Sequence, residues 1–355
     1  MTDPYKSSPE PVVADAIPQN ITTPLSTAAI FLVAMVDEGG ESAVRELLPD
    51  IAALRRAITF RRPDSGIKIV AGIGADVWPR LFNAPMPHEL HPFIELDGDR
   101  HRAPSTEGDV LFHIQASTIG VCFELADQIM SRLSGAVTAV EEVHGFQYFD
   151  RRNLLGFVDG TENPEGTEAV EAVYIDSEPD HTGGSYVIVQ KYIHDMDAWN
   201  SVSVEEQQRV VGRTKLDDIE FGDDTQASNS HVALTDISDD DGNDLDIYRA
   251  NMPFGSAGSR EHGTFFIGYA KRADTLEQML RNMFIGDPPG NSDRLLDFST
   301  AQTGSLFFAP SQDFLDDPPP APVSTATTAE ADEEETSPTN PDGSLGIGSL
   351  NRSTR

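Results

Sequence analysis

The order of apolar patterns along residues 27–149 restricts the fold of this chain more than any other feature. Apolar runs rich in β-branched residues predict buried strands, and apolar residues repeating every three or four positions predict helices. The predicted strands are 27–36, 67–73, 109–116 and 137–149. The predicted helices are 41–62, with Leu47, Ile51, Leu54 and Ile58 on one face, and 119–133, with Cys122, Ala126, Ile129 and Leu133. The resulting order, β-α-β-β-α-β, is typical of a ferredoxin-like unit.

The second half of the chain shows a similar pattern. Its predicted strands are 185–193, 263–270 and 305–309. Its predicted helices are 203–212, opened by the capping pair Ser203 and Glu206, and 274–284, opened by Asp274 and Glu277. We therefore predict an α+β fold in which duplicated ferredoxin-like (β-α-β-β-α-β) halves, about 25–150 and 184–310, form one dimeric α+β barrel-type body. A ligand would lie in one half, and the connection between the halves could let both contribute to its site.

The two ends differ in composition from this body. Residues 1–24 are rich in Pro, Ser and Thr, which predicts a flexible arm before a domain at 25–314. Residues 315–341 contain Pro-Pro-Pro and many acids with almost no large apolar side chain, which predicts a disordered linker. A separate peptide, 342–355, follows. The first 24 residues hold no apolar h-region, and no apolar run is long enough to span a bilayer, so we expect a cytoplasmic protein.

The net charge of the chain restricts the classes of partner that it can bind. Acids outnumber bases 59 to 25 among 355 residues, a formal net charge of −34. Such a field repels phosphate backbones and anionic membranes, so we expect neither nucleic-acid nor membrane binding. A solvated acidic face, attraction of cationic substrates or metal ions, and adaptation to salt remain open as its cause. The single cysteine, Cys122, is predicted to be a buried core residue.

A nine-residue string, Gly156–Pro164, places one acid among small residues. Asp159 is followed by Gly160, and Gly156 lies three residues before it. Glycine is the usual residue where the backbone takes a positive φ or approaches a ligand closely. The string therefore predicts a rigid turn that presents the carboxylate to a flat ligand. An ordinary Asp–Gly turn before an Asn–Pro break also fits this spacing.

Histidine is the commonest metal ligand among protein side chains, and the chain contains nine. His113 lies in an apolar strand and is predicted to be a core residue, whereas His88, His91 and His101 fall in a charged, Pro-rich loop and are predicted to be solvated. His231 lies where polar sequence becomes apolar. From these patterns alone, His231 is one of several candidate ligands.

The string resembles the GxxDG signature of the dye-decolourising peroxidases, a haem-dependent family, and the segment 249–254 fits the Arg-x-Asn region of its bacterial B-type members. The similarity covers roughly residues 27–310. It implies haem b as cofactor, with His231 as the proximal iron ligand. It also implies that Asp159, Arg249 and Asn251 lie on the distal side.

The resemblance further implies reduction of hydrogen peroxide with oxidation of a small-molecule reductant, such as dyes, phenolics or Mn(II)-like donors. Asp159 would move the peroxide proton, Arg249 would stabilise charge on the departing oxygen, and Asn251 would orient peroxide. We expect Asp159 and Arg249 both to contribute to the reaction with peroxide that forms the oxidising state of the enzyme. Two other roles are carried as alternatives: deferrochelatase-like release of iron from haem, and a non-catalytic haem-binding cargo.

Several further residues join this predicted site. Gly160 would let the backbone approach the cofactor, and Arg249 or another base would bind its propionates. Asp293 is either the acceptor for the proximal imidazole or the N-cap of a helix at 294–298. Phe266 packs either on the cofactor or in the core. Glu162 either helps to bind a cation or is a solvated turn acid.

The C-terminal peptide resembles the cargo-loading peptide that recruits such peroxidases into encapsulin shells. Leu345, Ile347 and Leu350 stand in a Gly/Ser frame and would dock on the inner wall of the shell. The resemblance therefore implies an encapsulin shell protein as partner and a place inside the encapsulin nanocompartment. It also implies a homo-oligomer, from a dimer to a hexamer.

Overall fold

The structure, a computed structural model, describes residues 16–160, 162–222, 224–239 and 241–323. The described residues from 16 to 322 form one compact unit. The predicted targeting peptide with Leu345, Ile347 and Leu350 lies outside the described residues. So do most of the predicted linker and the first fifteen residues.

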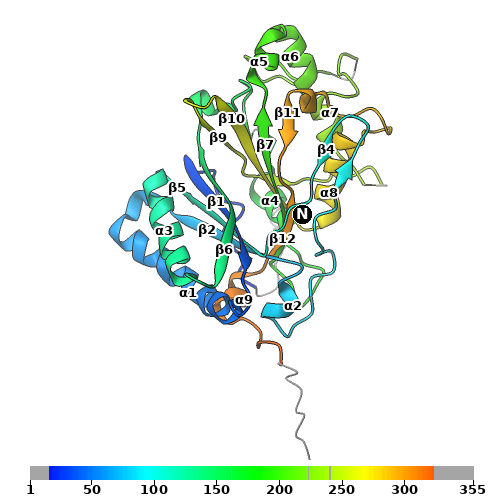
Figure 1. The fold of residues 1–355 in the computed structure, drawn as a ribbon. Helices are drawn as coiled ribbons and strands as arrows, with labels where there is room; N and C mark the ends of the chain where they lie inside the picture. Colours follow the sequence, from blue (N-terminus) through cyan, green and yellow to red (C-terminus); the bar gives the residue numbers. More distant parts are fainter. Residues whose placement is uncertain (1–15, 161, 223, 240, 324–355) are drawn as a thin grey trace, which may run out of the picture. The chain divides into compact units, whose positions relative to one another are not determined.

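The first half of the unit has the predicted ferredoxin-like arrangement (Figure 1). Its strands are β1 (Ala28–Val36), β2 (Lys68–Gly74), β5 (Val110–Ala116) and β6 (Val137–Phe146), and its main helices are α1 (Glu41–Arg61) and α3 (Ile119–Arg132). The strands pair antiparallel in the order β6-β1-β5-β2, and α1 and α3 pack against each other. The last strand ends at Phe146, earlier than predicted, because the chain then turns into the 3₁₀ helix η2 (Phe149–Arg151).

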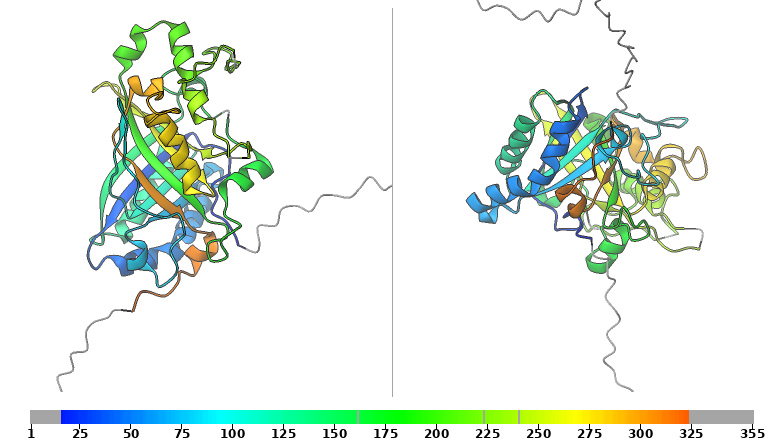
Figure 2. Two further views of the ribbon diagram at one scale, coloured as in Figure 1. Left: turned by 90° about the vertical axis from the view of Figure 1, so that its right-hand side faces the viewer. Right: turned by 90° about the horizontal axis from the view of Figure 1, so that it is seen from below.

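The second half repeats this order, with two successive short strands, β8 and β9, that the sequence patterns did not predict. Its strands are β7 (Ser185–His194), β8 (Tyr248–Arg249), β9 (Met252–Ser256), β10 (Glu261–Ala270) and β12 (Ser305–Ala309), with helices α6 (Val204–Val211) and α8 (Ala273–Phe284). They pair as β12-β7-β10, and β10 then pairs with both β8 and β9. Figure 2 shows α8 lying along the strands of this half, where it packs on β7 and β10.

The two sheets join into one. β12 pairs antiparallel with β2, which connects the halves into a ten-stranded sheet. At its far ends, β6 packs against β9, and a Cβ added to Gly145 would lie 2.6 Å from that of Met252. The sheet thus curves back on itself, which confirms the predicted duplicated, barrel-type α+β fold.

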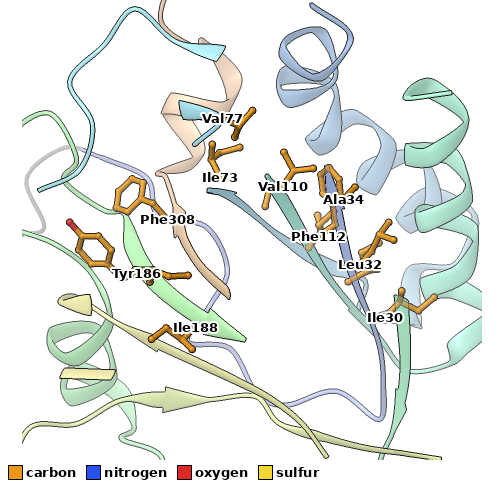
Figure 3. Packing of buried hydrophobic residues seen from close by; sticks show 14 of the residues in the cluster. Ile30, Leu32, Ala34, Ile73, Val77, Val110, Phe112, Tyr186, Ile188 and Phe308 are labelled. Atoms are coloured by element: carbon orange, nitrogen blue, oxygen red, sulfur yellow. The ribbon is translucent and has the colours of Figure 1, made fainter. Parts of the chain in front are cut away.

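The core has two layers because the central strands are buried on both faces. Alternate residues of a strand point to opposite faces. Ile30, Leu32 and Ala34 of β1 therefore pack toward the helices (Figure 3), whereas Phe31 and Val33 pack inside the barrel. This double burial explains why β1 is a continuous apolar run. Cys122 is buried in the outer layer, as predicted.

Shorter elements complete the unit. They are α2 (Trp78–Leu81), α4 (Gly166–Val173), α5 (Met196–Ser201), α7 (His231–Thr235), α9 (Gln312–Asp316), η1 (Pro63–Ser65), η3 (Arg294–Asp297), β3 (Leu96–Asp97), β4 (Arg102–Ala103) and β11 (Ser299–Ala301). Within the described ranges, no helix combines the length and apolar character that crossing a bilayer requires.

The two predicted helix caps differ in outcome. Ser203 caps α6 by accepting the N–H of Glu206, as predicted. The prediction that Asp274 opens α8 is wrong, because the N-cap is Arg272, which makes no side-chain cap. Asp274 is already inside the first turn, and its carboxylate accepts a hydrogen bond from Arg281.

Parts of both predicted flexible ends are fixed to the body. The side chain of Gln19 exchanges two hydrogen bonds of 2.8 Å with the backbone of Ala71, and Lys68 donates to the carbonyl oxygen of Pro24. Residues 19–24 are therefore not a flexible arm. At the other end, Asn83 donates to the carbonyl oxygen of Pro320, so the ordered body continues beyond residue 314.

Candidate active site

A cavity of about 410 Å³ lies in the second half of the unit. Its lining includes six of the seven predicted cofactor and catalytic residues: Asp159, Gly160, His231, Arg249, Asn251 and Phe266. The seventh, Asp293, does not line the cavity and contacts it through His231. Every lining residue comes from the range 153–299. The expectation that both halves contribute to the site is therefore wrong, since the connection and the second half form it.

His231 is the first residue of α7, whose N-cap is Ser230. Its Nδ1 lies 2.7 Å from Oδ2 of Asp293, which is fully buried. The other oxygen, Oδ1, accepts the N–H of Leu295 at 2.7 Å and caps η3. Both readings of Asp293 therefore hold at once, one on each oxygen. Because the carboxylate accepts at both oxygens, Nδ1 of His231 is the donor, and Nε2 keeps its lone pair for a ligand.

A second histidine, His194, also lines the cavity, but it is already engaged on both sides. Its Nδ1 lies 2.7 Å from Oγ of Ser299, and its Nε2 lies 2.9 Å from Oγ1 of Thr264. Burial lowers the pKa of His194 to about 4. A neutral ring with both nitrogens hydrogen-bonded is a poor metal ligand, so His231 is the better candidate of the two.

The remaining histidines discussed above lie outside this cavity. His113 is fully buried in β5 with Nδ1 bonded to the Tyr269 hydroxyl, which confirms it as a core residue. His88 is exposed, as predicted. His91 and His101 are less exposed than predicted, and they lie near Glu277 and Asp297, respectively.

The turn that carries Asp159 is rigid. Gly156 and Gly160 have φ of +93° and +79°, the left-handed region that the string predicted. Asn153 closes the turn, because its Oδ1 accepts the N–H of Phe157 and its own N–H donates to the Phe157 carbonyl. Beneath the turn, the ammonium group of Lys215 lies 5.4 Å from the ring centroid of Phe157, a cation–π contact.

The acid and the guanidinium influence each other's protonation. Burial raises the pKa of Asp159, while Arg249, the N–H of Gly160 and His231 oppose this rise. Burial also lowers the pKa of Arg249, and Asp159 opposes that fall. Both side chains lie deep in the fold yet keep surface exposed to the cavity. The pair places one proton acceptor and one fixed positive charge together.

Arg249, Asn251 and Phe266 share one face of the sheet. The pairing of Arg249 with Gly268 and of Met252 with Phe265 is one continuous register, which places Asn251 opposite Phe266. Residues two apart on a strand, and residues directly opposite, point to the same side. The strand is interrupted at Asn251, whose Oδ1 accepts the N–H of Ile267 at 3.0 Å.

The cavity has an apolar wall and a charged mouth. The apolar wall includes Val232, Ile237, Met279, Leu280, Met283, Leu295 and Leu296. At the mouth, Arg213 binds Glu162 at 2.6 Å and Asp218 at 3.1 Å. Asp236, Asp244 and Asp246 lie nearby, and burial together with these neighbouring carboxylates raises the pKa of Asp236.

Two residues that shape this site, Arg213 and Asn163, were not predicted from the sequence. Arg213 follows the Gly212 cap of α6, where a surface role is usual. Asn163 belongs to the nine-residue string, and its side chain hydrogen-bonds to the backbone of Arg249. Its place in the string was the only available signal for that contact.

The described lining of the cavity offers only one free imidazole as a metal ligand, which suits a metal ion whose other ligands come from a bound organic group. Among the described residues, no group of three His, Cys, Asp or Glu side chains could hold a metal ion. A single imidazole, an apolar wall and cationic side chains instead fit a flat metallo-ligand with acidic substituents. The acid, the guanidinium and the amide would then serve chemistry at that ligand.

Comparison with known proteins identifies the family of this chain. Family models described as "Dyp-type peroxidase, N-terminal" and "Dyp-type peroxidase, C-terminal" match residues 18–147 and 150–314. The chain is 58% identical over 339 residues to a dye-decolorizing peroxidase of Mycolicibacterium paratuberculosis, covering 95% of this chain and 94% of that protein.

Two solved structures are similar over most of the chain. The encapsulated DyP-type peroxidase from Mycobacterium smegmatis is 60% identical with a TM-score of 0.85, covering 86% of this chain and all of that one. A variant of DypB from Rhodococcus jostii in complex with heme is 53% identical with a TM-score of 0.83, covering 86% and 98%.

Proposed function

The chain belongs to the dye-decolourising peroxidase family, and on that premise we propose that it is a haem b-dependent peroxidase that reduces hydrogen peroxide and oxidises small one-electron donors. One observation carries the proposal. His231, backed by the buried carboxylate of Asp293, lines the same cavity as Asp159, Arg249 and Asn251.

The cavity residues divide between holding the cofactor and acting on peroxide. His231 would bind the iron through Nε2, and its hydrogen bond to Asp293 would raise the basicity of the imidazole. Phe266 and the α8 side chains would pack on the porphyrin, Gly160 would allow the backbone near it, and Arg249 or Arg213 would bind a propionate. When bound, the haem supplies the two-electron redox chemistry that breaks the O–O bond.

The distal residues would handle the proton and the charge of peroxide. Asp159 accepts the proton from one oxygen and returns it to the other. An arginine side chain keeps its proton in proteins. Arg249 would therefore stabilise negative charge on the departing oxygen. Because Oδ1 of Asn251 already accepts the Ile267 N–H, its amide nitrogen is the group that would orient peroxide.

The charged mouth favours cationic donors among the possible reductants. Asp236, Asp244, Asp246 and Glu162 gather at one side of the cavity, and mutual repulsion between carboxylates favours a positive ion or an aminated dye near them. Phenolic donors need no such charge. A comparison of Mn(II) with a neutral phenol as donor, before and after substitution of Asp236 by Asn, would separate the two classes.

The chain is also proposed to be an encapsulin cargo that works inside the shell as a homo-oligomer in the cytoplasm. The Mycobacterium smegmatis relative is described as encapsulated, which supports packaging. The docking residues Leu345, Ile347 and Leu350 belong to the C-terminal peptide, outside the described residues.

One experiment separates this function from its alternatives. The haem-loaded chain is mixed with hydrogen peroxide while its absorption spectrum is followed, and a donor is then added. A spectral change that reverses only with donor supports the peroxidase. An unchanged spectrum with intact haem would favour a non-catalytic haem-binding cargo, and iron-free porphyrin after reduction would favour deferrochelatase-like iron release.

A further inference from the structure

The side chain of Asn163 makes a two-bond pair with the peptide backbone of Arg249. Its Nδ2 donates to the carbonyl oxygen of Arg249 at 2.7 Å, and its Oδ1 accepts the Arg249 N–H at 2.9 Å. No other residue of the nine-residue string makes a described side-chain hydrogen bond to Arg249. Asn163 therefore links the aspartate turn to the strand that carries the guanidinium.

The position of Arg249 in the sheet explains why this link is needed. β8 is the last strand in the pairing order of the described sheet. Ala250 donates to the carbonyl oxygen of Ile267. In the alternating antiparallel pattern, the N–H and C=O of Arg249 therefore face the outer edge of the sheet. Without Asn163, both groups would lack the partner that a further strand would supply.

The opposite side of the same short segment is also held by a side chain. Ile267 donates its N–H to Oδ1 of Asn251, where a regular strand would use the carbonyl of Ala250. One edge of the segment 249–251 is thus bonded by the side chain of Asn163, and the other edge is bonded to β10 through the side chain of Asn251. Pro164, which is buried, directly follows Asn163 and restricts it to extended backbone.

We infer that Asn163 is a positioning residue for Arg249, fixing the guanidinium relative to the carboxylate of Asp159. Three residues separate Asp159 from Asn163 in one short segment, and the two-bond pair joins that segment to Arg249. The pair therefore holds the backbone of Arg249 at a point four positions after the acid in the chain. The inference rests on the proposed function, since it assigns Asn163 a part in the reaction of Arg249 and Asp159 with peroxide.

The chain contains a matched control for this pair. Gln19 makes the same two-bond arrangement with the backbone of Ala71 on β2, at 2.8 Å for both bonds. Neither Gln19 nor Ala71 lines the cavity. Replacing Gln19 by Ala removes the same carboxamide pair and one further hydrogen bond, to the carbonyl oxygen of Pro310. It therefore costs at least as many hydrogen bonds as the Asn163 substitution without disturbing Arg249.

The test uses haem-loaded Asn163→Ala, Asn163→Asp and Gln19→Ala proteins. Asn163→Asp keeps an acceptor for the Arg249 N–H but places a carboxylate oxygen against the Arg249 carbonyl. We expect both Asn163 variants to bind haem normally and to react with peroxide about tenfold more slowly or worse, since small displacements of reacting groups are costly. We expect Gln19→Ala to react within about twofold of the unchanged chain.

A second readout distinguishes positioning from simple loss of stability. Arg249 is the fixed positive charge that lowers the pKa of Asp159, and the N–H of Gly160 acts in the same direction. If Arg249 is displaced, the acid limb of the rate–pH profile should move to higher pH in the Asn163 variants and stay fixed in Gln19→Ala. An Asn163→Ala protein with an unchanged rate and acid limb would overturn the inference. An unchanged chain that ignores peroxide would instead overturn the proposed function.

Discussion

The carboxylate of Asp293 divides its two oxygens between a side chain and a backbone group: Oδ2 accepts from Nδ1 of His231 and Oδ1 from the N–H of Leu295. The same residue thus orients the imidazole and starts the 3₁₀ helix η3. Asp293→Asn can keep only one of these acceptor roles at full strength. We expect iron affinity or peroxide rate to fall about 10–100-fold, measured by haem titration and stopped-flow absorption. An Asp293→Asn protein equal to the unchanged chain in both would contradict the coupling.

Replacing His231 by Ala should abolish haem retention, because the other cavity histidine has both ring nitrogens hydrogen-bonded. The measurement is the haem content of the purified protein. His194→Ala serves as the control and should retain haem. Full haem content in His231→Ala would exclude His231 as the ligand.

Replacing Arg249 by Leu should slow the reaction with peroxide by about 10²–10³-fold, because a buried positive charge that stabilises the departing oxygen is lost. Stopped-flow mixing with excess peroxide measures this rate. Arg249→Lys keeps the charge but not the planar donor group, so it should recover only part of the loss. A near-normal rate in Arg249→Leu would remove Arg249 from the mechanism.

The rate should fall at low pH with a midpoint above the usual range of an aspartate, because burial raises the pKa of Asp159 and the reaction needs its ionised form. Asp159→Asn should lower the rate by about 10²–10⁴-fold and remove this acid limb. A rate–pH profile of the two proteins makes the comparison.

The raised pKa of Asp159 also affects the stability of the fold, because the ionised carboxylate that the reaction needs is the form that burial disfavours. A raised folded-state pKa favours the protonated carboxyl, so the stabilisation is present below the unfolded-state pKa and is lost as pH rises through the folded-state pKa. Near neutral pH, Asp159→Asn should therefore have a higher Tm than the unchanged chain. A lower Tm at that pH would show that the attraction to Arg249 outweighs burial.

Deleting residues 342–355 should leave the peroxide rate unchanged and stop co-purification with a co-expressed encapsulin shell. Size-exclusion chromatography of the assembled shells, followed by a haem absorbance reading, measures loading. Continued loading of the shortened chain would place the docking signal elsewhere.

Sequence patterns predicted most of the fold because its central strands are buried on both faces. The strand formed by β8 and β9 was missed because Asn251 interrupts it, leaving one piece of two residues and one of five. This strand carries Arg249 and Asn251, so their Arg-x-Asn spacing was identified by resemblance, although strand periodicity explains it.

The contacts of the site were less predictable than its residues. Asp293 and His231 are 62 positions apart, and Asn163 and Arg249 are 86 apart, so only the folded chain brings them together. The alternatives for Asp293 could not be separated from sequence because each describes one oxygen of the same group. The contribution expected from the first half was wrong because all cavity walls follow residue 152.

That one-sided cavity has a practical consequence for engineering. The outer faces of α1 and α3 belong to a half that supplies no wall to the reaction chamber, so charge redesign or fusion of a reporter there leaves the reacting groups untouched. Directed evolution of donor preference, in contrast, should confine its libraries to the connection and the second half.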